Sequence, residues 1–185
     1  MKFIATILST LLISQAALAL ECTAKNKKYQ VAECKINKLC ATDGNRNIEL
    51  SQDISAGDEV ECKDVNFDGY QDIIVSHPPS GQVQFSSVFL YDKSKDEYVK
   101  NDKISNLPCL KIDKSRRMIS GTCFSSSNCD KWIEQYKYRS DGELQLSLIK
   151  GTYCEPSTGN AFSYTETYKN GRIFKKQVKK LNDKL

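Results

Sequence analysis

The sequence predicts an all-β domain, a propeller-like or meander antiparallel fold that is stapled by disulfides. Three observations lead to this class. Apolar and polar residues alternate along most of the chain, as they do in strands with one buried face. Turn residues that tolerate positive φ separate the alternating runs. Eight cysteines offer cross-links. No window of about ten residues beyond the N-terminus has a helical period, so we expect little helix.

The N-terminal segment, residues 1–19, has the features of a cleaved signal peptide. One lysine precedes an apolar stretch from Phe3 to Ile13, and the small residues of Ala17 to Ala19 suit a signal peptidase. A retained membrane anchor is the alternative, but the stretch is shorter than the roughly 20 residues that span a bilayer. A lipid anchor on Cys22 is not expected, because Glu21 stands where a small residue is needed. The mature chain is then periplasmic or secreted, with no transmembrane anchor after processing.

The even cysteine count predicts four disulfides in an oxidising compartment. Four cysteines fall in each half of the mature chain, so we expect each half to be closed on itself: Cys22, Cys34, Cys40 and Cys62, then Cys109, Cys123, Cys129 and Cys154. Eight cysteines allow 105 pairings, so the connectivity stays open. Zinc is the competing use, but no pair has CxxC spacing and the single histidine, His77, is far from most of them.

Residues 20–185 fit a single all-β domain, because a chain of this length buries roughly 70% of the surface that it exposes when unfolded. The pattern leaves the packing of residues 20–60 open. The net charge is +4, and lysines cluster only at the C-terminal end, in "KKQVKKLNDKL". Such a run is usually solvated, and it has no interleaved aromatic residues to stack on bases. Nucleic acid is therefore not an expected partner.

The alternating runs of the later part of the chain predict its strands. In order, they are Val83–Asp92, Arg117–Phe124, Lys131–Tyr153 and Ala161–Val178. The third run is interrupted by "SDG" at 140–142 and the fourth by "NG" at 170–171, which are strong hairpin signals. We therefore expect two C-terminal hairpins. Trp132, at a strand position, is expected in the core or half buried rather than in a sugar site.

The stretch "DVNFDGYQDIIVS", residues 64–76, has the spacing of a calcium loop. Oxygen-bearing side chains occupy positions 1, 3, 5 and 9, a glycine at position 6 permits a sharp turn, and the carbonyl at position 7 adds an oxygen. The expected ligands are Asp64, Asn66, Asp68, the carbonyl of Tyr70, and Asp72. Position 12 is Val75 instead of glutamate, and a buried strand follows instead of a helix, so the loop is not an EF-hand.

A β-turn whose Asx side chains bond their own backbone is the alternative for this loop. The full DxNxDGxxD spacing favours the metal. We expect one structural calcium ion, which neutralises the carboxylates and fixes the loop before the strand. Outside the cell, a dissociation constant of about 10⁻⁴ to 10⁻³ M suffices for this role.

The segment "DVNFDGYQDIIVSHP" resembles the calcium loop of integrin-type FG-GAP propeller repeats, although the motif occurs once. Most of residues 60–180 resemble more closely the XAC2610-like family of periplasmic immunity proteins and lysozyme inhibitors. The matching parts are Asp64–Asp72, Val88–Phe124 and Tyr164–Lys176. The resemblance implies a propeller-like β fold and a periplasmic protein that binds a lysozyme-like toxin delivered by neighbouring cells. Residues 20–60 have no counterpart in it.

The resemblance therefore implies a calcium-binding immunity protein whose partner is a protein, a cell-wall hydrolase toxin. Such a protein would inhibit by filling the active-site groove, where peptidoglycan hydrolases work with carboxylates. The candidate inhibitory loop follows the calcium-loop strand and is stiffened by prolines; its residues are His77, Pro78, Pro79, Ser80, Gly81 and Gln82. The hairpin tip at Lys169–Arg172 is a second candidate. A surface loop without a partner is the alternative for both.

Two other classes of function remain open. The FG-GAP resemblance also allows a calcium-stabilised adhesive or structural module at the cell surface, although adhesins of that type usually repeat the loop. An enzyme is not expected, and no catalytic residue is assigned. His77 precedes two prolines without an evident nucleophile beside it. Scattered glutamates such as Glu134, Glu143 and Glu155 are more often solvated or ion-paired than catalytic.

Overall fold

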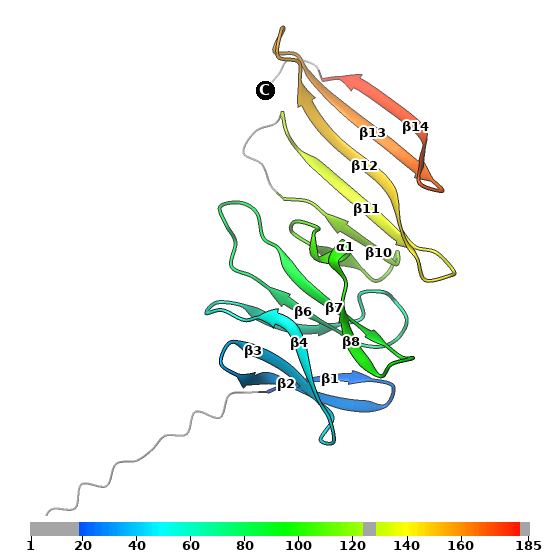
Figure 1. Ribbon diagram of the computed structural model, residues 1–185. Coiled ribbons are helices and arrows are strands. Elements are labelled where there is room, and N and C mark those ends of the chain that lie inside the picture. Colours follow the sequence, from blue (N-terminus) through cyan, green and yellow to red (C-terminus); the bar gives the residue numbers. More distant parts are fainter. Residues whose placement is uncertain (1–18, 124–128, 182–185) are drawn as a thin grey trace, which may run out of the picture.

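The computed structural model describes residues 19–123 and 129–181, which form three antiparallel sheets with the second between the other two (Figure 1). The first sheet contains β1 (Leu20–Ala24), β2 (Lys27–Lys35), β3 (Lys38–Thr42) and β4 (Asn47–Asp53). The second contains β5 (Glu59–Lys63), β6 (Asp72–Ser76), β7 (Ser86–Asp92) and β8 (Glu97–Lys100). The third contains β9 (Lys111–Asp113), β10 (Met118–Gly121), β11 (Trp132–Tyr138), β12 (Leu144–Cys154), β13 (Ala161–Lys169) and β14 (Arg172–Lys180).

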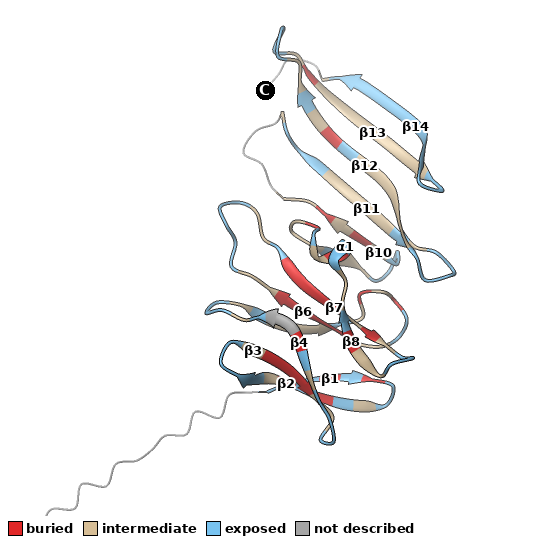
Figure 2. Cartoon of the chain, viewed as in Figure 1, coloured by how far each residue is buried: buried red, intermediate tan, exposed pale blue. Residues whose placement is uncertain are grey.

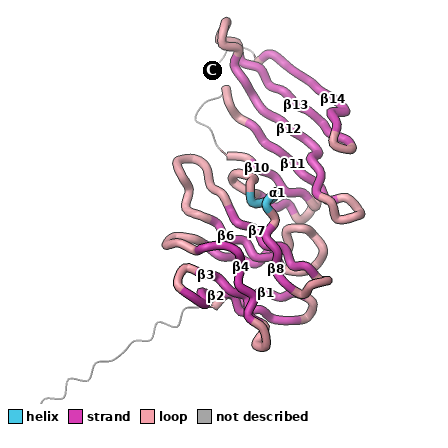
Figure 3. Tube along the Cα trace, viewed as in Figure 1, coloured by secondary structure: helices cyan, strands magenta, loops and turns pink. Residues whose placement is uncertain are grey.

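The all-β class is confirmed. Strands dominate the described chain, and the helix α1 (Asp102–Ser105) is a single turn between the second and third sheets (Figure 3). Strands that pair are consecutive in the chain, so each sheet is a meander, and none within the described ranges closes into a barrel. Both expected C-terminal hairpins form. Their turns have positive φ at Gly142 (84°), Asn170 (51°) and Gly171 (73°), which these residue types adopt readily.

The second sheet has apolar side chains on both faces, because it packs against both other sheets. Along β6, Ile73 and Val75 belong to the core shared with the first sheet, whereas Ile74 belongs to the core shared with α1 and the third sheet. β7 alternates in the same way, with Phe89 in the first core and Val88 in the second. The continuous apolar run of β6, expected to be a buried strand, is accordingly buried from Asp72 through Val75.

The carboxylate of Asp96, in the β7–β8 turn, joins the second sheet to the first. One of its oxygens accepts hydrogen bonds from Lys27 Nζ and Arg46 Nη2, each at 2.6 Å. The other accepts the hydroxyls of Tyr29, at 2.9 Å, and Tyr91. The pKa of Asp96 lies well below its ordinary value, mainly because Lys27 and then Tyr91 donate hydrogen bonds to the carboxylate.

The eight cysteines form four disulfides, two in each half, as the sequence predicted. The pairs are Cys22–Cys62, Cys34–Cys40, Cys109–Cys123 and Cys129–Cys154. The first of them links β1 to β5 and so ties the first sheet to the second. Of residues 20–60, whose packing the sequence left open, residues 20–53 form the first sheet and Glu59 begins β5 of the second. Four disulfides fit a protein of an oxidising compartment outside the cytoplasm.

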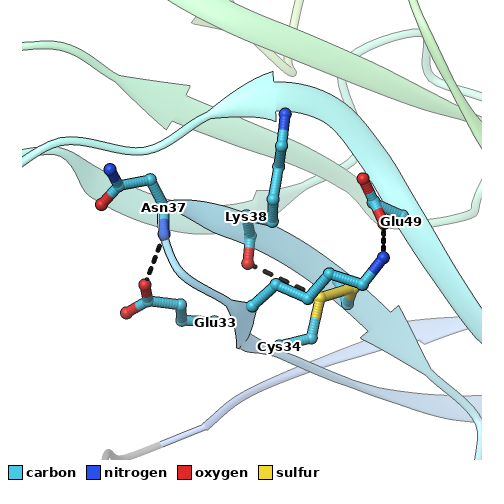
Figure 4. Close-up of a disulfide and its surroundings, with 7 residues drawn as sticks. Glu33, Cys34, Asn37, Lys38 and Glu49 are labelled. Atoms are coloured by element: carbon cyan, nitrogen blue, oxygen red, sulfur yellow. Dashed lines mark hydrogen bonds and ion pairs between the residues drawn. A yellow bond between two sulfur atoms is a disulfide. The ribbon is translucent and has the colours of Figure 1, made fainter.

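The Cys34–Cys40 disulfide staples the β2–β3 hairpin close to its tip (Figure 4). The backbone N–H of Asn37 donates to Glu33 Oε1 at 2.7 Å across the same turn. Lys35 Nζ reaches Glu49 on β4 at 2.6 Å. These contacts hold the tip rigid, although the Ile36 side chain that it carries is 88% exposed.

The expected signal peptide lies outside the described residues, apart from Ala19, and stays a prediction. Between residues 19 and 123 and between 129 and 181, the structure has no helix that is long and apolar enough to cross a membrane. Burial is greatest in the first two sheets and falls toward the outer strands of the third (Figure 2). Every residue of β14 is exposed.

Candidate functional site

The acidic loop before β6 is tightly turned and held together by its own side chains. Phe67 and Gly69 adopt positive φ, 61° and 93°. The backbone N–H of Asp68 lies 3.1 Å from both Asp64 Oδ1 and Asn66 Oδ1, which brings these two oxygens to one place. Asp68 in turn accepts the Tyr70 N–H at 3.0 Å and the amide of Asn66 at 3.0 Å. The first three expected ligand side chains are therefore neighbours.

Asp72, the fourth expected ligand side chain, has a different role in this geometry. It is fully buried, and its carboxylate accepts the backbone N–H groups of Val65 (2.7 Å), Asn66 (3.4 Å) and Tyr91 (2.9 Å). Burial raises its pKa to about 7, although the hydrogen bonds from Tyr91 and Val65 act in the opposite direction. Asp72 thus fastens both ends of the loop and the neighbouring strand β7.

The side chains of Asp64, Asn66 and Asp68 carry the oxygen types that a hard cation of calcium's size prefers. Both carboxylate oxygens of Asp64 accept backbone N–H groups, from Asp68 at 3.1 Å and from the glycine that follows it at 3.0 Å, as in the alternative Asx turn. The hydroxyl of Tyr138 is buried without a hydrogen-bond partner, and burial together with the three loop aspartates raises its pKa. Within the described ranges, no group of three or more His, Cys, Asp or Glu residues has a metal-binding arrangement. Calcium therefore stays a prediction, with Asp72 supporting the loop rather than facing the ion.

The loop borders a polar hollow of about 550 Å³ between the second and third sheets. Asn66 and Asp68 line one side, and Asp141 and Gly142 of the β11–β12 turn line another. The guanidinium of Arg117 donates to the carbonyl of Phe67 at 2.9 Å, so the third sheet also braces the loop. A ligand in this hollow would meet carboxylate and amide oxygens and also two lysine side chains from the second sheet and its turn.

The candidate inhibitory loop, residues 77–82, is exposed from Pro78 to Gln82. Its base is anchored by His77, whose Nδ1 lies 3.0 Å from Asp58 Oδ1 and whose Nε2 lies 3.1 Å from Ser87 Oγ. Two backbone hydrogen bonds between Ser80 and Val83, of 2.8 and 3.2 Å, close the loop on itself. The loop is therefore a pre-organised protrusion rather than a flexible connection.

Asp58, His77 and Ser87 are hydrogen-bonded to one another in the order of a catalytic triad. The sequence did not reveal this arrangement. Ser87 is only 5% exposed, however, and lies within β7, so its hydroxyl offers substrate little access. The three side chains instead clamp the start of the loop to β7 and to the turn before β5. The sequence showed no evident nucleophile beside His77, because residues 77 and 87 meet only when β6 and β7 pair.

Two other predicted positions lie in the third sheet. The hairpin tip at Lys169–Arg172 is exposed and stands at the outer end of the sheet (Figure 1). Trp132, expected in the core or half buried, is 41% exposed at the start of β11. Trp132 belongs to neither of the two buried cores of the described residues, so strand position alone did not fully bury the indole.

The architecture can be compared with known proteins. No protein-family model matches the sequence, and no curated protein matches it. The fold is similar to that of a solved Xanthomonas type IV secretion system related protein. The two structures superpose with a TM-score of 0.54 at 16% sequence identity, over 89% of this chain and 87% of the other. At this identity the likeness shows a shared fold.

Proposed function

We propose that this chain is a secreted or periplasmic, calcium-binding immunity protein that inhibits a lysozyme-like peptidoglycan hydrolase by binding its active-site groove. The observation that carries the proposal is the likeness of fold, along nearly the whole chain, to a type IV secretion system related protein. The acidic loop also resembles the corresponding loop of immunity proteins that bind delivered toxins. The four disulfides support an extracytoplasmic site of action.

Inhibition of this kind requires binding, with no chemistry by the inhibitor. A hydrolase groove contains paired carboxylates and sugar subsites, so an ordered protrusion that enters it excludes the substrate. In the proposal the candidate is the loop of residues 77–82, whose base is already fixed by His77. A rigid loop binds at a smaller entropic cost than a flexible one. Calcium would neutralise Asp64 and Asp68 and hold the loop that leads into β6.

The inhibition test uses the mature, oxidised chain in calcium against purified lysozyme-like hydrolases, with clearance of cell-wall suspensions as the readout. We expect stoichiometric loss of activity for at least one enzyme. A chain that leaves every enzyme fully active would contradict the proposal and favour the calcium-stabilised adhesive or structural module. Replacing Pro78–Gly81 with a neutral linker tests the loop at 77–82 by itself: weakened inhibition without unfolding would assign the contact to that loop, and undiminished inhibition would exclude it.

The calcium test is a thermal melt of wild type and Asp68→Ala in calcium and in chelator. We expect the substitution to lower the melting temperature more in calcium than in chelator, because the lost carboxylate holds the turn in both conditions and the ion in calcium alone. Asp53→Ala, on β4 of the first sheet, is the control. An equal loss for Asp68→Ala in calcium and in chelator would rule out the metal loop.

A further inference from the structure

The outer edge of the third sheet is a basic strand. β14 contains five cations, Arg172, Lys175, Lys176, Lys179 and Lys180, and no acidic residue. Lys176 pairs with Glu166 at 2.7 Å, and the other four have no ion pair among the described residues. Register places Lys176 opposite Glu166 and Lys175 opposite Thr167, so successive lysines point to opposite faces of the sheet. The edge is therefore positive on both faces.

Large apolar side chains accompany these cations. Phe174 is 71% exposed, Ile173 52% and Val178 49%. The whole of β14 is exposed in Figure 2, in contrast to the buried strands of the second sheet. Exposed aromatic and arginine side chains on one rigid element are the residue types that dominate binding energy at protein interfaces.

The tip of the β13–β14 hairpin is pre-organised. Asn170 and Gly171 form its two-residue turn with positive φ, which matches the twist of paired strands. Lys169 Nζ lies 5.9 Å from the centre of the Phe174 ring, within cation–π range. A hollow of about 490 Å³ is lined by Lys169, Asn170, Arg172, Ile173 and Phe174.

Protection of a sheet edge explains only part of this composition. Lysines on an edge strand prevent it from pairing with other chains. A phenylalanine that is 71% exposed on the same edge works against that protection, so it requires another reason. A membrane surface is also a poor match, because an interfacial element needs its cations on one face and its apolar side chains on the other. A cleft with acidic walls matches cations on both faces of a projecting hairpin.

We propose that the β13–β14 hairpin, in place of the candidate loop at 77–82, is the element that enters the carboxylate-bearing groove of the protein partner, with Arg172 and Phe174 as its anchors. The identity of the groove rests on the proposed function. Arg172 would pair with carboxylates at the groove, Phe174 would fill an apolar subsite, and the lysines of β14 would steer the encounter. The loop at 77–82 has no comparable charge: its one ionisable side chain, His77, is held by Asp58 and Ser87.

The test compares four forms of the mature, oxidised chain in calcium: wild type, Arg172→Glu/Phe174→Ala, the Pro78–Gly81 linker variant, and a control, Arg116→Glu/Val99→Ala. The control makes the same charge change and also truncates an exposed apolar side chain, far from the hairpin in sequence. Affinity and inhibition are measured with the hydrolase that wild type inhibits most strongly. We expect the hairpin variant to bind at least about 30-fold more weakly, and the control and linker variants to stay within about threefold of wild type.

The outcomes separate this inference from the proposed function. If wild type inhibits the enzyme and the hairpin variant inhibits equally well, the hairpin assignment is wrong while the function stands. If wild type inhibits no enzyme, the proposed function is wrong. Carbodiimide cross-linking to secreted proteins of competing bacteria then tests whether the hairpin binds an acidic protein partner. Links from Lys175, Lys179 or Lys180 to acidic residues of one protein, lost in the hairpin variant, support it. Absence of such links overturns it.

Discussion

The Asp96 network permits a quantitative prediction about how the first two sheets are joined. Asp96→Asn keeps the shape of the side chain, and asparagine tolerates the positive φ of 58° at this position. An amide offers one acceptor oxygen where the carboxylate offers two. Two of the four donors, either the Lys27 and Arg46 pair or the two tyrosine hydroxyls, then face an NH₂ group.

The expected cost follows from these contacts. A hydrogen bond to a charged group contributes about 1.5–3 kcal/mol when it is well buried. Here the Asp96 side chain is 24% exposed and those of Lys27 and Arg46 are more than 40% exposed, so solvent screening reduces the contribution. We expect Asp96→Asn to lower the free energy of unfolding by about 2 kcal/mol. For a domain of this size that corresponds to a fall of about 4–8 °C in melting temperature.

The assay is urea unfolding of the oxidised chain at neutral pH, repeated at decreasing pH. The folded-state pKa of Asp96 is lower than its unfolded value, so its stabilisation is present above about pH 4 and is lost as the pH falls below that value. The difference in the free energy of unfolding between wild type and Asp96→Asn should therefore become smaller in acid. Asp53→Asn, which removes an exposed partner of Lys38, is the control and should cost less than about 1 kcal/mol. Equal losses for the two variants at neutral pH would refute the reasoning.

Two further predictions concern the covalent and packing constraints. Removing Cys22–Cys62, which closes a 40-residue separation, should cost about 4 kcal/mol, and removing Cys34–Cys40, with a separation of 6, about 2 kcal/mol by loop-closure entropy. Denaturant midpoints of the paired alanine variants check this, and a larger loss for the short loop would contradict it. Gly151→Ala should destabilise the third sheet by about 1–3 kcal/mol, because a Cβ there would lie 2.4 Å from the Lys131 carbonyl oxygen and 2.8 Å from the Tyr164 hydroxyl. Thermal melts measure this cost, with Ser163→Ala as the control. Equal melting temperatures for Gly151→Ala and the control would show that the surrounding atoms move aside at no cost.

Local features of the fold were predictable because short-range chemistry sets them. The "NG" and "SDG" turns supply residues that accept positive φ, and the hairpins β13–β14 and β11–β12 form around them. The apolar run of β6 indicated a buried strand, and it lies between two cores. The even division of cysteines indicated two cross-links in each half, although pattern alone could not choose among their pairings.

The details of the site depended on long-range contacts. The spacing of the acidic loop placed Asp64, Asn66 and Asp68 together, but it could not show that Asp72 would be buried and bound by backbone N–H groups from two segments. Asp58, His77 and Ser87 are separated by 19 and 10 residues, and they meet only through the pairing of β5, β6 and β7.

The sequence by itself determined the class of fold, the turns, the compartment expected for a cysteine-rich chain, and the candidate metal loop, because each follows from residues that are neighbours along the chain. The tertiary structure decided which carboxylates are buried, which histidine contacts form, and which edge remains exposed with its cations and its phenylalanine. Those outcomes depend on how the sheets stack, since burial changes the solvation of a carboxylate and the lack of a covering layer leaves β14 open.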